Sequence, residues 1–202
     1  MKADNLTVAI LAGGDSNRIG SYKAMTDYRG KPLLAHMIEI GKKVSSNVLV
    51  VVSNSNQMQM AKQLDPDINV VVDAERTPRS TLSEAVAGFG NASSDYTLLL
   101  PADSPKANID LLITLGQMKE GHGAVVPSWP NGSVEPLHSI YMSEHAHVSG
   151  LKALKSEFPH MQNFLSLLTN VIYVSTEVLK QFDPKLETFD RVNSPSNPGR
   201  LK

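Results

Sequence analysis

Four short apolar runs in the first half of the chain have the pattern of strands buried on both faces. They cover residues 7–12, 47–53, 69–73 and 96–103 and are rich in valine and leucine. Apolar runs of this length, without the alternation of a half-exposed strand, are typical of a parallel sheet that helices cover on both sides. We therefore predict four parallel strands here.

The segments between these runs carry the spacing of amphipathic helices. Pro32 suits the first turn of a helix whose apolar stripe lies within residues 33–40. Thr81 and Glu84 have the spacing of a capping box, and Asn108 is a suitable N-cap for the apolar segment that follows it. Strands therefore alternate with helices.

This alternation predicts an α/β fold, namely a three-layer α/β/α sandwich around a mostly parallel, doubly wound, Rossmann-like sheet. Ligands of such folds bind beyond the carboxyl ends of the strands. The early runs end there in glycines or polar residues, which are Gly13 and Gly14, Ser53, Asp73 and Asp103. We expect these residues to form one rim.

The second half of the chain is less regular. Its pattern predicts strands over residues 123–129, 135–142 and 170–175 and helices over residues 144–157 and 160–168. We expect a mixed sheet in this half, with insertions over one face.

Length and composition indicate one globular domain. The 202 residues fit a single domain, and a hydrophobic share of 41% with 19% charged residues excludes a disordered chain. The 19 basic and 20 acidic residues give a formal net charge of -1. That balance provides no broad positive field for nucleic acid or an acidic membrane, so we expect any bound anion to be held locally.

Cysteine is absent, which excludes disulfides and thiolate chemistry and suits a reducing cytoplasm. No apolar stretch approaches the roughly 20 residues of a membrane span. We expect a cytoplasmic protein that binds neither membrane nor nucleic acid.

Two glycines and two cations follow the first apolar run. The spacing of Gly14, Gly20 and Lys23 fits neither the Rossmann fingerprint nor the P-loop. Backbone N–H groups of glycines can nevertheless approach an anion closely, and Arg18 and Lys23 are placed to hold phosphates further along a chain. Each feature alone has an ordinary explanation as a turn or a solvated charge, but their joint placement favours a triphosphate site.

Residues 11–25, LAGGDSNRIGSYKAM, resemble the L-A-G-G-x-S-x-R-M-G-x-D-K-x-L signature of nucleotidyltransferases with a glycosyltransferase-A-like fold. Within that superfamily the chain is most similar to the bacterial and archaeal molybdenum cofactor guanylyltransferases. The resemblance continues through GKPLLAHMI, VVVD, PADSP, EPLHSIY and FDRVNSPSN and so covers nearly the whole chain. PLHSIY and VNSP favour the molybdenum cofactor branch.

The resemblance implies Mg²⁺-dependent transfer of GMP from GTP to the phosphate of molybdopterin, with release of pyrophosphate. It implies one domain over residues 1–202, with a nucleotide-binding half (1–105) and an acceptor-binding half (106–202), and protein partners among molybdoenzymes or cofactor-insertion proteins. Three other enzymatic activities are alternatives: cytidylyl transfer to the same acceptor, guanylyl transfer to a cobalamin precursor, and sugar-phosphate nucleotidyl transfer. A non-catalytic nucleotide-binding adaptor is a further alternative.

Carried over to this chain, the nucleotide loop of the family falls on Leu11, Ala12 and Gly13, and its phosphate-binding lysine on Lys23. We expect Gly13 and Gly14 to cradle phosphates. Arg18 and Lys23 are the candidate catalytic cations that neutralise charge on the α-phosphate and pyrophosphate.

The family's base and ribose contacts fall near Ser53 and on Asp73, and its metal-binding aspartate falls on Asp103. Asn193 matches the second asparagine of an N-x-N-T-P element. Each residue has a competing explanation. Asp103 is equally suited to an Asx turn or a helix cap, Asp73 to a turn or a second metal site, and Asn193 to an ordinary loop. His138 either approaches the acceptor or is simply packed in the sheet.

The chain departs from the family pattern at four places. Tyr22 replaces the aspartate before the loop lysine, Ile19 replaces a methionine, and Arg191 replaces the first asparagine of N-x-N-T-P. The sequence STL from Ser80 replaces a G-P-L element. These changes leave Lys23 and Asp103 intact, so they bear on the acceptor more than on the reaction type.

Overall fold

The computed structural model describes residues 3–14, 22–73 and 80–192, and most of its strands form one seven-stranded sheet. The strand order is β5-β4-β1-β6-β8-β7-β9. The bounds are Leu6–Leu11 (β1), Asn47–Val52 (β4), Asn69–Val72 (β5), Tyr96–Pro101 (β6), Ala124–Ser128 (β7), Ile140–Met142 (β8) and Val171–Ser175 (β9). A separate antiparallel pair comprises β2 (Asp27–Tyr28) and β3 (Lys31–Pro32).

The four apolar runs of the first half are parallel neighbours, as predicted. Strand β1 lies between β4 and β6, with Val8 opposite both Val48 and Leu98. Strand β8 pairs antiparallel with β6 and with β7, and β9 pairs parallel with β7. The sheet is therefore mostly parallel, with a single reversed strand among those that the structure describes.

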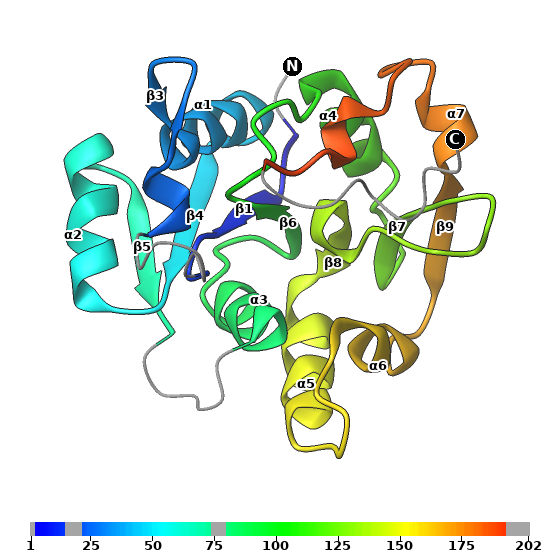
Figure 1. Cartoon of the computed structure of the whole chain (residues 1–202). Coiled ribbons are helices and arrows are strands. Elements are labelled where there is room, and N and C mark those ends of the chain that lie inside the picture. The colour runs from blue at the N-terminus through cyan, green and yellow to red at the C-terminus, as the bar shows by residue number, and fades with distance from the viewer. Residues whose placement is uncertain (1–2, 15–21, 74–79, 193–202) are drawn as a thin grey trace.

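Helices cover both faces of the sheet, which confirms the three-layer prediction. Figure 1 shows α3, α5 and α6 below the sheet and α1 and α4 above it. The α-helices span Leu33–Val44 (α1), Ser55–Leu64 (α2), Thr81–Gly90 (α3), Ile109–Gln117 (α4), Ser143–Leu154 (α5), Met161–Ser166 (α6) and Thr176–Leu179 (α7). Short 3-10 helices span Lys23–Met25 (η1), Pro136–His138 (η2) and Glu187–Phe189 (η3). No helix within the described residues is long and apolar enough to cross a membrane.

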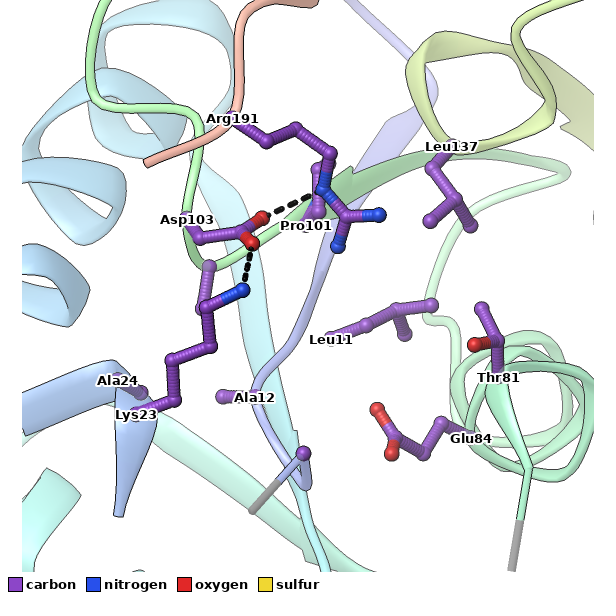
Figure 2. Close-up of a pocket in the computed structure, with 12 residues that line it drawn as sticks. Leu11, Ala12, Lys23, Ala24, Thr81, Glu84, Pro101, Asp103, Leu137 and Arg191 are labelled. Atoms are coloured by element: carbon purple, nitrogen blue, oxygen red, sulfur yellow. Dashed lines mark hydrogen bonds and ion pairs between the residues drawn. The ribbon is translucent and has the colours of Figure 1, made fainter. Parts of the chain in front are cut away.

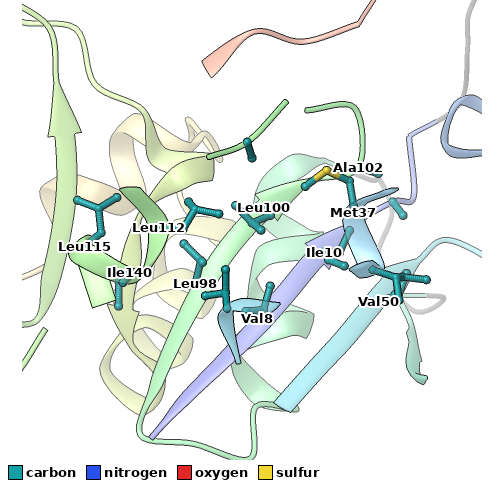
Figure 3. Packing of buried hydrophobic residues seen from close by; sticks show 14 of the residues in the cluster. Val8, Ile10, Met37, Val50, Leu98, Leu100, Ala102, Leu112, Leu115 and Ile140 are labelled. Atoms are coloured by element: carbon teal, nitrogen blue, oxygen red, sulfur yellow. The ribbon is translucent and has the colours of Figure 1, made fainter. Parts of the chain in front are cut away.

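Two hydrophobic clusters fill the spaces between the layers. Because successive strand residues point to opposite faces, Val8 and Ile10 of β1 pack in one cluster while Ala9 and Leu11 pack in the other. Figure 3 shows the first cluster, where Met37 of α1 lies close to the strand residues. Sheet residues are thus buried on both sides, which explains their continuous apolar runs.

The cap of α3 differs from the prediction by one residue. Ser80 is the N-cap, and its side chain accepts the Ser83 N–H while the Ser83 hydroxyl accepts the Ser80 N–H. The capping box expected from Thr81 and Glu84 is therefore wrong, and the Glu84 side chain does not serve it. Asn108 caps α4 as predicted, because its side chain accepts the Leu111 N–H.

The strand predicted over residues 135–142 is shorter in the structure. Pro136 begins the 3-10 helix η2, and the strand itself covers only Ile140–Met142. Proline lacks the N–H that a strand ladder needs, which accounts for this helical turn before the strand. The two predicted helices of this half are present with shorter bounds.

Candidate functional site

A cleft opens at the carboxyl ends of β1 and β6, where the fold predicts a ligand site (Figure 2). Its volume of about 190 Å³ is below the roughly 300 Å³ of a typical small-molecule pocket, so the described residues alone form only a small cleft. The lining residues are Leu11, Ala12, Gly14, Lys23, Ala24, Thr81, Glu84, Pro101, Ala102, Asp103, Leu137 and Arg191.

Three ionised side chains meet on one side of the cleft, and we call them the charged cluster: Lys23, Asp103 and Arg191. The Lys23 Nζ atom lies 2.5 Å from Asp103 Oδ2, and the Arg191 Nε atom lies 2.8 Å from Asp103 Oδ1. The Asp103 side chain is 5% exposed, whereas those of Lys23 and Arg191 are 28% and 42% exposed. The cluster therefore buries one carboxylate beneath two partly exposed cations.

The surroundings of Asp103 favour its ionised form. Burial alone opposes ionisation, but the Arg191 charge and the hydrogen bonds from Lys23 and Arg191 outweigh burial and hold the pKa of Asp103 below its ordinary value. Asp103 is therefore an anion at neutral pH, and the cluster carries a formal charge of about +1.

The competing explanations for Asp103 are wrong. The N-cap of the following helix α4 is Asn108, and both Asp103 carboxylate oxygens accept hydrogen bonds from side chains. The main chain of Asp103 has a different partner, because its carbonyl oxygen accepts the Val192 N–H at 2.9 Å. Asp103 thus brings together η1, the end of β6 and the segment after η3.

Across the cleft from the charged cluster, the lining residue Glu84 contacts Gly13, which Ser53 holds from another side. We call this arrangement the glycine contact: Gly13, Ser53 and Glu84. The Ser53 hydroxyl donates to the Gly13 carbonyl at 2.8 Å, and the Gly13 N–H donates to Glu84 Oε2 at 3.3 Å. A Cβ atom at Gly13 would lie 2.4 Å from the Ser53 Oγ atom. Only glycine fits here without displacing a neighbour.

The other predicted site residues lie in three kinds of place. Leu11, Ala12, Gly14 and Lys23 line the cleft. Ser53 is 2% exposed and Asp73 is 5% exposed, and neither is among the lining residues. Asp73 nevertheless follows β5 at the same edge of the sheet as the cleft. Arg18 and Asn193 lie outside the described residues.

His138 is packed rather than open to the cleft. It is 1% exposed, and its ring meets Phe189 edge to face with 5.3 Å between the centroids. Burial, together with the Arg191 charge, lowers the pKa of His138 to about 3, against an opposing effect of Asp103. The histidine is therefore neutral at neutral pH, and its neighbour Leu137 is the residue that lines the cleft.

Two cleft residues were not predicted to act there. Arg191 was visible in the sequence as a departure from the family pattern, but its contact with a residue 88 positions away was not. Glu84 was assigned to a helix cap. Its contact with the Gly13 N–H joins residues 71 positions apart, which no local signal in the sequence indicates.

The comparisons with known proteins agree with this geometry. Residues 8–171 match the model of the MobA-like NTP transferase domain. The chain belongs to this family. It is therefore related to enzymes that transfer nucleotidyl groups, and the fold places its cleft where such folds bind ligands.

Individual relatives extend over most of the chain. A probable molybdenum cofactor guanylyltransferase from Pyrococcus horikoshii is 30% identical over 86% of this chain and 88% of its own length. One from Methanosarcina acetivorans is 27% identical over 92% of this chain and 84% of its own length. The crystal structure of molybdopterin-guanine dinucleotide biosynthesis protein A from Archaeoglobus fulgidus superposes with a TM-score of 0.79. The superposition covers 94% of this chain and 93% of that chain at 23% sequence identity, so the fold is shared.

Proposed function

We propose that this protein transfers GMP from GTP to the phosphate of molybdopterin and releases pyrophosphate. The charged cluster in the ligand-binding cleft of a MobA-like NTP transferase fold is the observation that carries the proposal. The base and the acceptor come from the names of the relatives, which are molybdenum cofactor guanylyltransferases. The lack of cysteine supports the cytoplasm as the place of the reaction.

In this reaction an oxygen of the acceptor phosphate forms a bond to the α-phosphorus of GTP. The bond from the α-phosphorus to the oxygen that bridges to the β-phosphate breaks, and its electron pair leaves with pyrophosphate. The attacking oxygen is already an anion, so no side chain has to remove a proton. Such a transfer requires positioning and charge stabilisation more than covalent help from the protein.

Lys23 supplies that charge stabilisation in our proposal. Its ammonium group lies on the cleft side of the cluster, and its side chain is exposed enough to turn from Asp103 to a phosphate oxygen. A lysine acts on phosphate as a mobile point charge, so exchanging one anion for another suits it. We assign the same role to Arg18, on the strength of its place in the loop sequence.

Asp103 fits Mg²⁺ that arrives with a triphosphate. Magnesium typically takes one or two carboxylates and completes its shell with substrate phosphates and water, and Asp103 offers one ionised carboxylate at the cleft. The described residues contain no group of three or more potential metal ligands, so they match a substrate-borne metal better than one held by protein alone. When bound, Mg²⁺ would neutralise charge on the triphosphate. Asp103 would be the residue of this chain that holds it.

The test measures pyrophosphate release by the purified protein with molybdopterin and each of the four nucleoside triphosphates, with and without Mg²⁺. We expect release with GTP alone, and only when Mg²⁺ is present. Release with CTP would instead favour cytidylyl transfer, and nucleotide binding without release would favour an adaptor. Equal release after chelation of the metal would contradict the assignment of Mg²⁺.

A further inference from the structure

We propose that Arg191 is a phosphate-binding residue of the cleft, and that it grips a substrate phosphate through its terminal Nη groups while its Nε group stays on Asp103. This inference deepens the proposed function and rests on it for the identity of the substrates. The binding of phosphate itself follows from the contacts of Arg191.

Within the part of the chain that the structure describes, Arg191 uses one of its donors and keeps the others available. A guanidinium group has five N–H donors in one plane, and here the Nε donor is taken by Asp103 Oδ1 at 2.8 Å. Among the described residues, the side-chain hydrogen bonds of Arg191 involve Nε alone. In Figure 2 the two Nη groups point away from Asp103 toward the side of the cleft lined by Leu11 and Leu137.

The charge balance of the cluster favours an anion at this place. Two cations face one carboxylate, so a formal charge of about +1 remains on the cleft side. Apolar Leu11, Pro101 and Leu137 line the space beside the guanidinium, and such surroundings strengthen its interaction with an anion. A planar fork that holds a carboxylate on one edge can bind a phosphate on another, whereas a lysine offers only a point charge.

The position of Arg191 is set by the main chain around it. On one side the Val192 N–H donates to the Asp103 carbonyl oxygen at 2.9 Å. On the other side Phe189 is 2% exposed and packs edge to face on Trp129, with 5.7 Å between the ring centroids. The residue is therefore held at the cleft by contacts that do not use its side chain, and we expect substitutions at 191 to leave the fold intact.

The experiment compares wild type with Arg191→Lys and Arg191→Met, and uses Lys106→Met as a matched control. Lys106 is a nearby cation that pairs with Glu187 and is not among the residues that line the cleft. Calorimetric titration with tripolyphosphate measures phosphate binding without base or acceptor. We expect Arg191→Met to weaken it about 10- to 100-fold, as for the loss of a charged hydrogen bond. The affinity of Arg191→Lys for tripolyphosphate should lie between those of wild type and Arg191→Met. The affinity of the Lys106→Met control should equal that of wild type.

Two further titrations identify the phosphate. A raised Kd for GTP in the Arg191 variants assigns the nucleotide, and a raised KM for molybdopterin at unchanged GTP affinity assigns the acceptor. Unchanged values for tripolyphosphate, GTP and molybdopterin in both variants, with urea midpoints equal to wild type, would overturn the inference and leave the proposed function standing. Arg191-dependent tripolyphosphate binding in a wild-type protein that does not turn over GTP would instead support the inference and refute the proposed function.

Discussion

The two sides of the cleft are built from opposite kinds of charge. The charged cluster places two cations over one carboxylate, whereas the glycine contact places one carboxylate against a backbone N–H. The first side has a formal charge of about +1, whereas the second presents a carboxylate that accepts the Gly13 N–H. In our proposal the triphosphate therefore binds on the side of Lys23 and Arg191.

The comparison also bears on the expectation that Gly13 and Gly14 cradle phosphates. In the structure the Gly13 N–H already has a carboxylate partner, so a phosphate at that N–H would have to displace Glu84. Gly14 lines the cleft and has open space where a Cβ would lie. The role of the two glycines in phosphate binding stays a prediction.

The largest effect should come from removing the mobile cation of the charged cluster. Lys23→Ala is expected to lower kcat by on the order of 10²–10³, the range typical of losing one preorganised group that stabilises transition-state charge. Steady-state pyrophosphate release measures it, with Lys106→Ala as the control for the loss of a surface lysine. Unchanged turnover would remove Lys23 from the mechanism.

The glycine contact is tested by adding one methyl group. In Gly13→Ala the new Cβ would lie 2.4 Å from Ser53 Oγ and 2.8 Å from Glu84 Oε1, so these side chains or the loop have to shift and their hydrogen bonds to Gly13 are disturbed. We expect a loss of about 1–3 kcal/mol in the free energy of unfolding, as for other overpacked sites. Gly14→Ala is the matched control, since a Cβ there meets nothing within 4 Å. Equal urea midpoints for the two variants would show that Gly13 is not tightly held.

The carboxylate of the charged cluster is tested by Asp103→Asn. This change keeps the shape of the side chain and removes its charge, so we expect the Mg²⁺ concentration for half-maximal activity to rise by about tenfold or more, the effect of losing one charged contact. Mg²⁺ titrations of pyrophosphate release measure the shift. The same Mg²⁺ requirement in wild type and variant would place the metal elsewhere.

His138 packs against Phe189, two residues before the arginine of the charged cluster, and it should make the fold sensitive to acid. Its pKa is about 3 in the folded protein against 6.5 ordinarily. Between pH 6.5 and about pH 3 this histidine is protonated in the unfolded chain and neutral in the folded protein. The free energy of unfolding therefore falls as pH falls, by about 1.4 kcal/mol per pH unit. Above that window this contribution is constant.

Urea midpoints from pH 7 to pH 4 measure this effect. His138→Phe should flatten the dependence, while His160→Gln, which changes an exposed histidine, should follow wild type. Parallel curves for wild type and His138→Phe would contradict the low pKa of His138.

The smallest effect should come from Glu84→Gln, which keeps the hydrogen-bond acceptor for Gly13 but removes the negative charge. Less repulsion of a triphosphate should tighten GTP binding about twofold to fivefold, in the range of partly exposed charge interactions. Calorimetry at low and high salt measures it, and the gain should shrink at high salt. Weaker GTP binding would mean that Glu84 contacts the nucleotide directly.

The sequence predicted the regular half of the fold because its signals are local. Continuous apolar runs such as residues 47–53 and 96–103 are typical of strands covered on both sides, and Asn108 marks a helix start by its own chemistry. The segment at residues 135–142 was predicted less well, since Pro136 and His138 interrupt a pattern that periodicity alone assigns to one strand.

The residues of the candidate site likewise divide into those that local sequence signals predict and those that they do not. Lys23 and Asp103 were predicted from motif and strand ends, and the structure brings them into contact. The contact of Arg191 with Asp103 depends on how the chain returns to the sheet after η3, which no local pattern encodes. Glu84 was misassigned because Ser80 rather than Thr81 caps α3, so Ser83 and not Glu84 stands at the position that bonds back to the cap.

The hydrogen bond from the Val192 N–H to the Asp103 carbonyl oxygen has a consequence for how this protein can change over evolutionary time or in the laboratory. It fixes the backbone beside position 191 and does not involve the side chain of residue 191. Position 191 is therefore a site in the cleft lining where different side chains can be exchanged while the backbone keeps its place. A library of substitutions at this single codon would vary the phosphate contact of the cleft while the rest of the domain stays as it is.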